Sequence, residues 1–328
     1  MAKKNIVELP FYKYLWNFYS VHKAEIKSEY DPLTKRILSH ANPENPGAFL
    51  RKPQYEAFEI YVFLKEYLDN PKLFDLFNDW RHNKGKFCVK DTNLLDSIST
   101  DLFAEQEEMR KIEDAKIIEP AITQLQNLRQ TYSNYIFSLT MGTGKTILMA
   151  LCIFYEFLLA KKNPKDLRFC HNALVLAPDT TVLQSLKEIL TFDKSKIFSP
   201  EYANTLDSML KFHFLEDDGI SLSTMDGSDY NVIISTSQKI ILKKKHKEDS
   251  ASIQLFKESW DSAMENNPNA DLYQLDETEL TANQRYVKIT RLPQLGIYVD
   301  EAHHAFGKSL KSDMLDRSKE TSLRLTID

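Results

Sequence analysis

SLTMGTGKTILMAL, from Ser138 to Leu151, contains the most informative pattern in this chain. It nearly matches G-x-x-x-x-G-K-[ST], in which glycines let successive backbone N–H groups turn inward around a phosphate. Gly142 and Gly144 supply that conformational freedom, and Lys145 and Thr146 complete the pattern. A β-prone run precedes the glycines and a long apolar run follows them, which is the setting that a phosphate-binding loop requires. The stretch therefore predicts such a loop between a strand and a helix.

Each residue type in this loop has a chemical role in the prediction. Lys145 is placed to reach the β- and γ-phosphates of a nucleotide, and the Thr146 hydroxyl is placed to ligate Mg²⁺. The helix that begins there adds its N-terminal dipole. The alternative is a glycine turn that happens to precede a lysine. The residues expected to contact the nucleotide are Leu139, Thr140, Met141, Gly142, Thr143, Gly144, Lys145 and Thr146.

A second motif, LGIYVDEAHH, is an apolar run that ends in two adjacent carboxylates. A carboxylate at the end of a buried strand can hold Mg²⁺, and this role falls to Asp300. The next residue, Glu301, is placed to orient and polarise an attacking water. The alternative is a solvated acidic strand end. Because the motif lies downstream of a glycine-Lys-Thr loop, the pair of motifs favours nucleotide hydrolysis.

The pattern of apolar residues changes near Tyr135. Before it, apolar residues recur at helical spacing, and the aromatic run Phe11–Tyr19 predicts a packed helical core rather than a base-stacking surface. After it, short β-prone runs alternate with amphipathic stretches, which predicts an α/β fold with a parallel sheet covered on both faces. The expected strands are YIFSLT, ALVLAPD, NVIISTSQ, LGIYVDEAHH and SLRLTID. The most apolar run, Ile147–Ala160, is too short to span a bilayer and contains Glu156, so we expect a buried helix.

These motifs together resemble a known group of proteins. Asp300-Glu301-Ala302-His303 is the DEAH box of superfamily 2 helicases and translocases, and MGTGKT resembles their motif I. LRKPQYEAF resembles the upstream LR-x-x-Q segment, and VLAPDTTVLQSL and VIISTSQKI resemble the motifs that hold nucleic acid. The resemblance is closest to the ATPase domain of type III restriction enzyme Res subunits and related defence helicases.

The resemblance implies roles for further residues. Gln54 would read the adenine of ATP. A glutamine amide suits adenine because it carries both a hydrogen-bond donor and an acceptor. His303 would couple the ATP site to the nucleic-acid site. One strand of nucleic acid would be held through backbone amides and small hydroxyls, although Ser and Thr at such positions are also ordinary helix caps and strand-end residues. The nucleic-acid residues would be Pro178, Thr180, Thr181, Ser235, Thr236 and Ser237.

The resemblance also implies an organisation and a set of ligands. We expect a helical N-terminal region (1–48), an adenine-motif segment with a helical insertion (49–133) and a RecA-like P-loop NTPase domain (134–328). The implied activity is that of an ATP-dependent helicase, a hydrolase acting on ATP, with ATP and Mg²⁺ as ligands. The implied partners are nucleic acid, DNA rather than RNA, and a second motor domain, nuclease or methyltransferase subunit on another chain.

Three features depart from the family pattern. Leu139 stands where a small residue is usual, but it precedes the loop proper, so we expect nucleotide binding to survive. Asp328 stands where motif III usually has a threonine, which affects the coupling of hydrolysis to strand movement. The sequence stops at motif III, so we expect a truncated motor with weak activity, because a second domain's arginine normally completes the site. The alternative function is a non-catalytic nucleotide- and nucleic-acid-binding module, or an inactive fragment, acting through a partner.

Composition excludes several classes of protein. The formal net charge of −5 argues against a protein that coats polyanions in general, but leaves room for a local basic cleft. Three cysteines without C-x-x-C spacing fit a reducing cytosol and give no sign of a zinc site. The basic N-terminus lacks an apolar core followed by a cleavage site, so we predict a cytoplasmic protein without a signal peptide or membrane partner.

Overall fold

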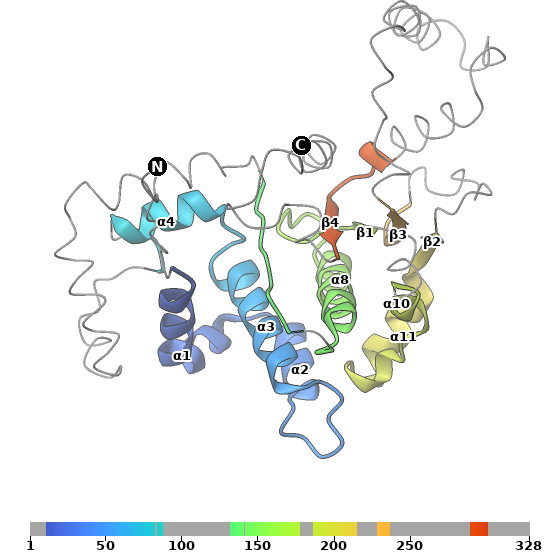
Figure 1. Cartoon of the computed structure of the whole chain (residues 1–328), viewed down its shortest axis with the longest axis horizontal. Helices are drawn as coiled ribbons and strands as arrows, with labels where there is room; N and C mark the ends of the chain where they lie inside the picture. Colours follow the sequence, from blue (N-terminus) through green and yellow to red (C-terminus); the bar gives the residue numbers. More distant parts are fainter. Residues whose placement is uncertain are drawn as a thin grey trace, which may run out of the picture. The chain divides into compact units, whose positions relative to one another are not determined.

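The computed structural model describes residues 11–82, 84–87, 132–140, 142–177, 186–214, 228–236 and 289–300 of the chain. They form a mixed α/β structure with N-terminal helices and a parallel sheet, which confirms the predicted fold class (Figure 1). The chain divides into two compact units, each described here by itself. The first lies within Met1–Phe169 and Asp193–Thr205, and the second within Cys170–Phe192 and Leu206–Asp328.

The described part of the first unit is built from helices (Figure 1). They are α1 (Phe11–Glu29), α2 (Pro32–His40), α3 (Lys52–Val62), the π-helix η1 (Phe63–Tyr67), α4 (Leu73–Arg81), α8 (Lys145–Lys162), the 3₁₀ turn η2 (Lys194–Lys196) and the first part of α11 (Pro200–Met209). Local capping explains where α2 begins: the Asp31 side chain accepts a hydrogen bond from the backbone N–H of Leu33 at 2.8 Å, and Pro32 follows the cap.

Aromatic side chains of the N-terminal run form a core in the first unit. Tyr14, Phe18 and Tyr19 are buried, and the ring of Tyr19 lies 5.3 Å from that of Phe63 in η1. Burial of such large apolar surfaces is a main source of helix packing energy. The run therefore packs a helical core, as the sequence predicts.

The helix α8 is the central element of the first unit. Every residue from Ala150 to Ala160 is buried, which confirms the prediction of a buried helix. Its Tyr155 ring meets Phe58 of α3 edge-on, with ring centroids 5.4 Å apart. Because α8 is apolar around its circumference, it needs neighbours on all sides, and α3 with η1 supplies one of them.

The second unit contains a four-stranded parallel sheet in the order β2-β3-β1-β4 (Figure 1). Its strands are β1 (Asn172–Ala177), β2 (Lys211–Phe214), β3 (Asn231–Thr236) and β4 (Leu295–Val299), and the short helix α10 (Glu188–Thr191) belongs to the same unit. All six residues of β1 and all six of β3 are buried. Their near-continuous apolar sequences, ALVLA and VIIS, are those expected of central strands covered on both faces.

Polar side chains fix the register at the start of the two central strands. The Asn231 side chain donates to the Asn172 Oδ1 atom at 2.7 Å, and Asn172 donates to the Pro293 carbonyl at 3.0 Å. His213 of β2 lies 2.9 Å from Asn231 Oδ1. A one-residue shift of the strand register would break these buried hydrogen bonds. The network and the apolar pattern therefore both specify how the strands pair.

One expected strand is absent from the described sheet. The stretch YIFSLT has no assigned strand, although its residues alternate between exposed and half-buried. Ile136 is 82% exposed, whereas the Tyr135 hydroxyl donates to the Pro71 carbonyl at 2.9 Å and Phe137 lies edge-on to Tyr61. Side-chain contacts with the helical unit therefore hold this segment. The expected final strand, SLRLTID, lies outside the described residues.

Within the described ranges, no helix is both long enough and apolar enough to cross a membrane.

Candidate nucleotide-binding site

Both glycines of the predicted phosphate loop adopt a left-handed backbone conformation. Gly142 has φ +73° and Gly144 has φ +76°, values that residues with a side chain rarely adopt. The Thr143 hydroxyl donates to the Thr140 carbonyl at 2.6 Å and closes the turn between them. Left-handed residues of this kind occur in loops whose backbone N–H groups bind anions.

The loop leads directly into α8. Lys145 and Thr146 are the first two residues of this 18-residue helix, and both are half-buried. The first N–H groups of a helix have no partner within it, and the helix dipole favours negative charge there. A loop of N–H donors, a helix N-terminus, a lysine and a threonine hydroxyl together fit a polyphosphate with its Mg²⁺ ion.

The first turn of α3 lies against this loop. The Gln54 side chain donates to the Gly144 carbonyl at 3.0 Å, and its Oε1 atom accepts from the Arg51 backbone N–H at 2.9 Å. Arg51 Nη1 donates to the Gly142 carbonyl at 2.9 Å. The structure therefore brings together two sites that the sequence separates by a long insertion, the glutamine segment and the glycine loop.

Close packing makes Gly144 the more constrained of the two glycines. A Cβ atom at Gly144 would lie 2.5 Å from Gln54 Nε2, whereas one at Gly142 would have nothing within 4 Å. Gln54 is only 5% exposed. Gly144 is thus required both for its backbone conformation and for its contact with Gln54.

The second unit places other predicted site residues at one edge of the sheet. Asp300 follows β4 directly, is buried, and its N–H donates to the Leu176 carbonyl of β1 at 3.0 Å. Ser235 and Thr236 end β3, on the other side of β1. Because neighbouring strands lie about 4.8 Å apart, Asp300 and the β3 end are separated by roughly 10 Å across the sheet. Carboxyl ends of parallel strands are where ligands bind in open α/β sheets.

The side chains at the β3 end are buried. Ser235 and Thr236 are both buried, and the Ser235 hydroxyl donates to the Thr236 carbonyl at 3.2 Å. These contacts are those of ordinary strand-end residues, the alternative that the sequence leaves open. Leu139 is half-buried and Thr140 is exposed. The predicted site residues outside the described ranges are Met141, Pro178, Thr180, Thr181, Ser237, Glu301 and His303.

Comparison with protein families gives the ancestry of this arrangement. The family model for the type III restriction enzyme, res subunit, matches residues 105–326, more than half of the chain. The chain belongs to this family. It is a helicase family with an ATP-binding domain of RecA-like P-loop fold, so membership implies a nucleoside triphosphate ligand and nucleic-acid binding. No curated protein and no solved structure matches the chain.

The Res-family match begins after the N-terminal helices. It includes the phosphate loop, α8 and the strands, but not α3. Sequence reasoning singled out Gln54 but missed Arg51, three residues earlier in the same LR-x-x-Q segment. The signal was its place in that segment, but its contact partner, the Gly142 carbonyl, is distant in sequence and is visible only in the folded chain.

Replacing Gln54 tests which of two roles its amide has. As an adenine-reading residue, Gln54→Ala should lower the affinity for ATP and leave that for GTP unchanged. As a support of the loop through the Gly144 carbonyl, the same change should lower both affinities, by about tenfold for one lost buried hydrogen bond. Titration calorimetry with both nucleotides separates these outcomes.

Gln54→Glu is the matched control for this experiment. It keeps the length and the Oε1 acceptor for the Arg51 N–H, but it places a second oxygen against the Gly144 carbonyl. If loop support matters, both nucleotides should bind more weakly to this variant as well. GTP affinities equal to wild type in both variants would leave base reading as the only role.

Proposed function

We propose that this chain is the Mg-ATP-binding motor domain of a DNA helicase or translocase of restriction-modification or related defence type. The observation that carries the proposal is the loop at Gly142 and Gly144, with two left-handed glycines directly before Lys145 and Thr146 at the N-terminus of α8. Membership of the Res subunit family supports the same assignment. We propose DNA rather than RNA as the nucleic acid, in line with that family's name.

In this proposal different groups of the chain bind the phosphates, the base, the metal ion and the attacking water. Backbone N–H groups of the loop and the Lys145 ammonium bind the phosphates, and Gln54 lies beside the loop to contact the base. The residues proposed as Mg²⁺ ligands are Thr146 and Asp300, and the ion would neutralise phosphate charge. Glu301 accepts a proton from the attacking water, and His303 transmits the state of this site to the nucleic-acid site.

Nucleic acid is proposed to bind at the carboxyl edge of the sheet. The residues assigned to it are Pro178, Thr180, Thr181, Ser235, Thr236 and Ser237. Contacts from hydroxyls and backbone amides to phosphates carry no sequence information. A nuclease or methyltransferase subunit on another chain would then supply target recognition and cleavage, and a second motor domain would supply the arginine that completes the ATP site.

Glu301→Gln separates nucleotide binding from hydrolysis. We expect this variant to bind Mg-ATP with wild-type affinity and to lose the slow turnover of the wild-type chain, because the amide cannot accept the proton. Binding is measured by calorimetry with Mg²⁺ and with EDTA, and turnover by phosphate release with and without single-stranded DNA, duplex DNA and RNA.

The outcomes distinguish the proposal from its rival. Wild-type protein that binds Mg-ATP but releases phosphate no faster than Glu301→Gln, with every nucleic acid, would favour a non-catalytic binding module. Protein that fails to bind any nucleotide would contradict the proposal itself.

A further inference from the structure

The helix α8 contains a buried carboxylate, Glu156, that forms an ion pair with Lys65 of η1. Glu156 is 2% exposed, and its Oε1 atom lies 3.0 Å from the Lys65 ammonium, which is itself 8% exposed. The Tyr61 hydroxyl donates to the same oxygen. Lys65 also donates to the Arg168 carbonyl at 2.6 Å, just beyond the end of α8. A buried carboxylate requires such partners, since removing one of them leaves an uncompensated charge.

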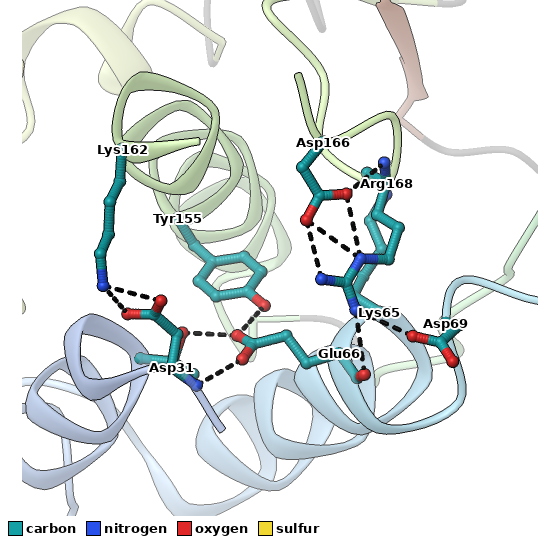
Figure 2. Close-up of polar contacts among 9 residues, drawn as sticks. Asp31, Lys65, Glu66, Asp69, Tyr155, Lys162, Asp166 and Arg168 are labelled. Carbon is teal, nitrogen blue, oxygen red and sulfur yellow. Dashed lines mark hydrogen bonds and ion pairs between the residues drawn. The ribbon is translucent and has the colours of Figure 1, made fainter. Parts of the chain in front are cut away.

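The residue after Lys65 makes a second connection. Glu66 accepts hydrogen bonds from the Tyr155 hydroxyl of α8 at 2.6 Å, from the Thr34 hydroxyl at 2.5 Å and from the Asp31 backbone N–H at 2.8 Å. Figure 2 shows Glu66 between Tyr155 and Asp31, with Lys162 of α8 on the far side of Asp31. The Lys162 ammonium donates to both Asp31 oxygens, at 2.6 and 2.7 Å.

Lys65 and Glu66 both lie in the π-helical turn η1, and both contact α8. In η1 the Leu68 N–H donates to the Phe63 carbonyl at 3.1 Å, the wider spacing that defines a π-turn. Lys65 contacts Glu156 and Glu66 contacts Tyr155, so two neighbouring residues of η1 engage two neighbouring residues of α8. Single π-turns occur frequently at functional sites.

The contacts of α3 and η1 with α8 begin at the phosphate loop. Gln54 contacts Gly144, and Lys65 with Glu66 contacts Tyr155 and Glu156. The two chain segments between these contacts have matching lengths, roughly 17 Å at 1.5 Å per residue. The continuous helix α3–η1 therefore runs in parallel beside α8, fixed to it at the loop end and at the buried charges.

We propose that Lys65 and Glu66 are positioning residues for the phosphate loop, acting through α8. By fixing α8 against η1, they hold Gln54 of α3 and the preceding residue Arg51 in register with the carbonyls of Gly144 and Gly142. The inference rests on the proposed nucleotide-binding function of that loop. It also extends the nucleotide site beyond the Res-family match, because residues 52–67 precede the matched range 105–326.

The test compares charge variants at the buried pair. Lys65→Met leaves Glu156 buried without its cation, Lys65→Met/Glu156→Gln removes both charges, and Lys65→Arg keeps the cation. Arg36→Met is the matched control, because Arg36 forms an exposed ion pair with Glu201 in the same unit. Two readouts are taken: amide hydrogen exchange of residues 142–148 without nucleotide, and the Kd for Mg-ATP.

The expected pattern is specific to positioning. Lys65→Met should speed exchange in the loop and weaken ATP binding by ~10-fold or more, whereas the double variant and Lys65→Arg should return both readouts to within ~3-fold of wild type. Arg36→Met should change neither. Faster exchange confined to residues 150–160, with wild-type exchange at 142–148, would reduce Lys65 to a structural role and overturn the proposal.

Milder variants keep the test decisive if Lys65→Met fails to fold. Tyr155→Phe removes one donor to Glu66, and Glu66→Gln sets an amide group against the Asp31 N–H or the two hydroxyls. Folded variants of both kinds with unchanged loop exchange would overturn the proposal. Hydrogen exchange is measured without nucleotide, so it tests the positioning role even if the chain binds no ATP. A wild-type chain that binds no ATP would contradict the proposed function alone.

Discussion

Lys145→Ala is expected to lower the affinity for Mg-ATP by ~100-fold or more, since charge-assisted hydrogen bonds contribute about 1.5–3 kcal/mol each and this lysine is placed to reach two phosphates. Its location supports the ligand role. Lys145 is the first residue of α8, and a positive charge at a helix N-terminus is disfavoured by the helix dipole. Removing it should therefore relieve an unfavourable interaction with the helix dipole.

Lys161→Ala provides a control with the opposite expectation. Lys161 lies in the last turn of the same helix and is exposed, where a positive charge favours the dipole. Its removal should lower stability slightly and leave ATP affinity unchanged. Calorimetry measures the affinities and urea unfolding the stabilities. Equal ATP affinities for wild type and Lys145→Ala would contradict the assignment of the loop.

Local patterns made part of this site predictable. The conformations of Gly142 and Gly144 follow from a short motif whose chemistry requires left-handed residues, so the sequence alone was enough to expect them. The central strands β1 and β3 were equally predictable, because continuous apolar runs are needed where both faces of a sheet are covered. The strand β2 was not predicted, since KFHF is short and half polar.

Long-range contacts account for what the sequence did not predict. Lys65 and Glu66 occupy positions in an amphipathic helix that look solvent-facing. In the folded chain Lys65 is buried against Glu156, and half-buried Glu66 accepts a hydrogen bond from Tyr155, and both of these partners are distant in sequence. Similarly, YIFSLT has a strand-like pattern, but its contacts with Pro71 and Tyr61 depend on the packing of the helical unit. Pairing choices of this kind depend on residues far apart in the chain.

The resemblance of LRKPQYEAF to a nucleotide motif suggested that Gln54 lies near the loop, but not what its amide would contact. In the structure both ends of that amide are engaged, one by the Arg51 N–H and the other by the Gly144 carbonyl. An amide has a second hydrogen and a second lone pair, so these contacts leave capacity for a base. Gln54 thus has the capacity both to support the loop and to contact adenine. A substitution at Gly144 tests the support of the loop separately.

Gly144→Ala should destabilise the nucleotide-free chain by about 3 kcal/mol, of which about 1–2 kcal/mol comes from the left-handed backbone and the rest from the clash with Gln54. The added methyl would lie 2.5 Å from Gln54 Nε2, so the glutamine would have to leave its position on the loop. Gly142→Ala is the matched control, because Gly142 has nearly the same φ but open space around a Cβ. Gly142→Ala should therefore lower the free energy of unfolding only by the contribution of the left-handed backbone, about 1–2 kcal/mol.

The double variant Gly144→Ala/Gln54→Ala isolates the clash. Removing the glutamine side chain makes room for the methyl but leaves the backbone strain, so the loss should be smaller than the sum of the two single losses by about 1–2 kcal/mol. Urea unfolding of the four proteins without nucleotide measures this coupling. Losses that add to within about 0.5 kcal/mol would mean that Gln54 does not press against Gly144 in solution. A clear coupling would instead establish that α3 holds the phosphate loop before any nucleotide binds, which is the state that the Lys65 and Glu66 contacts are proposed to maintain.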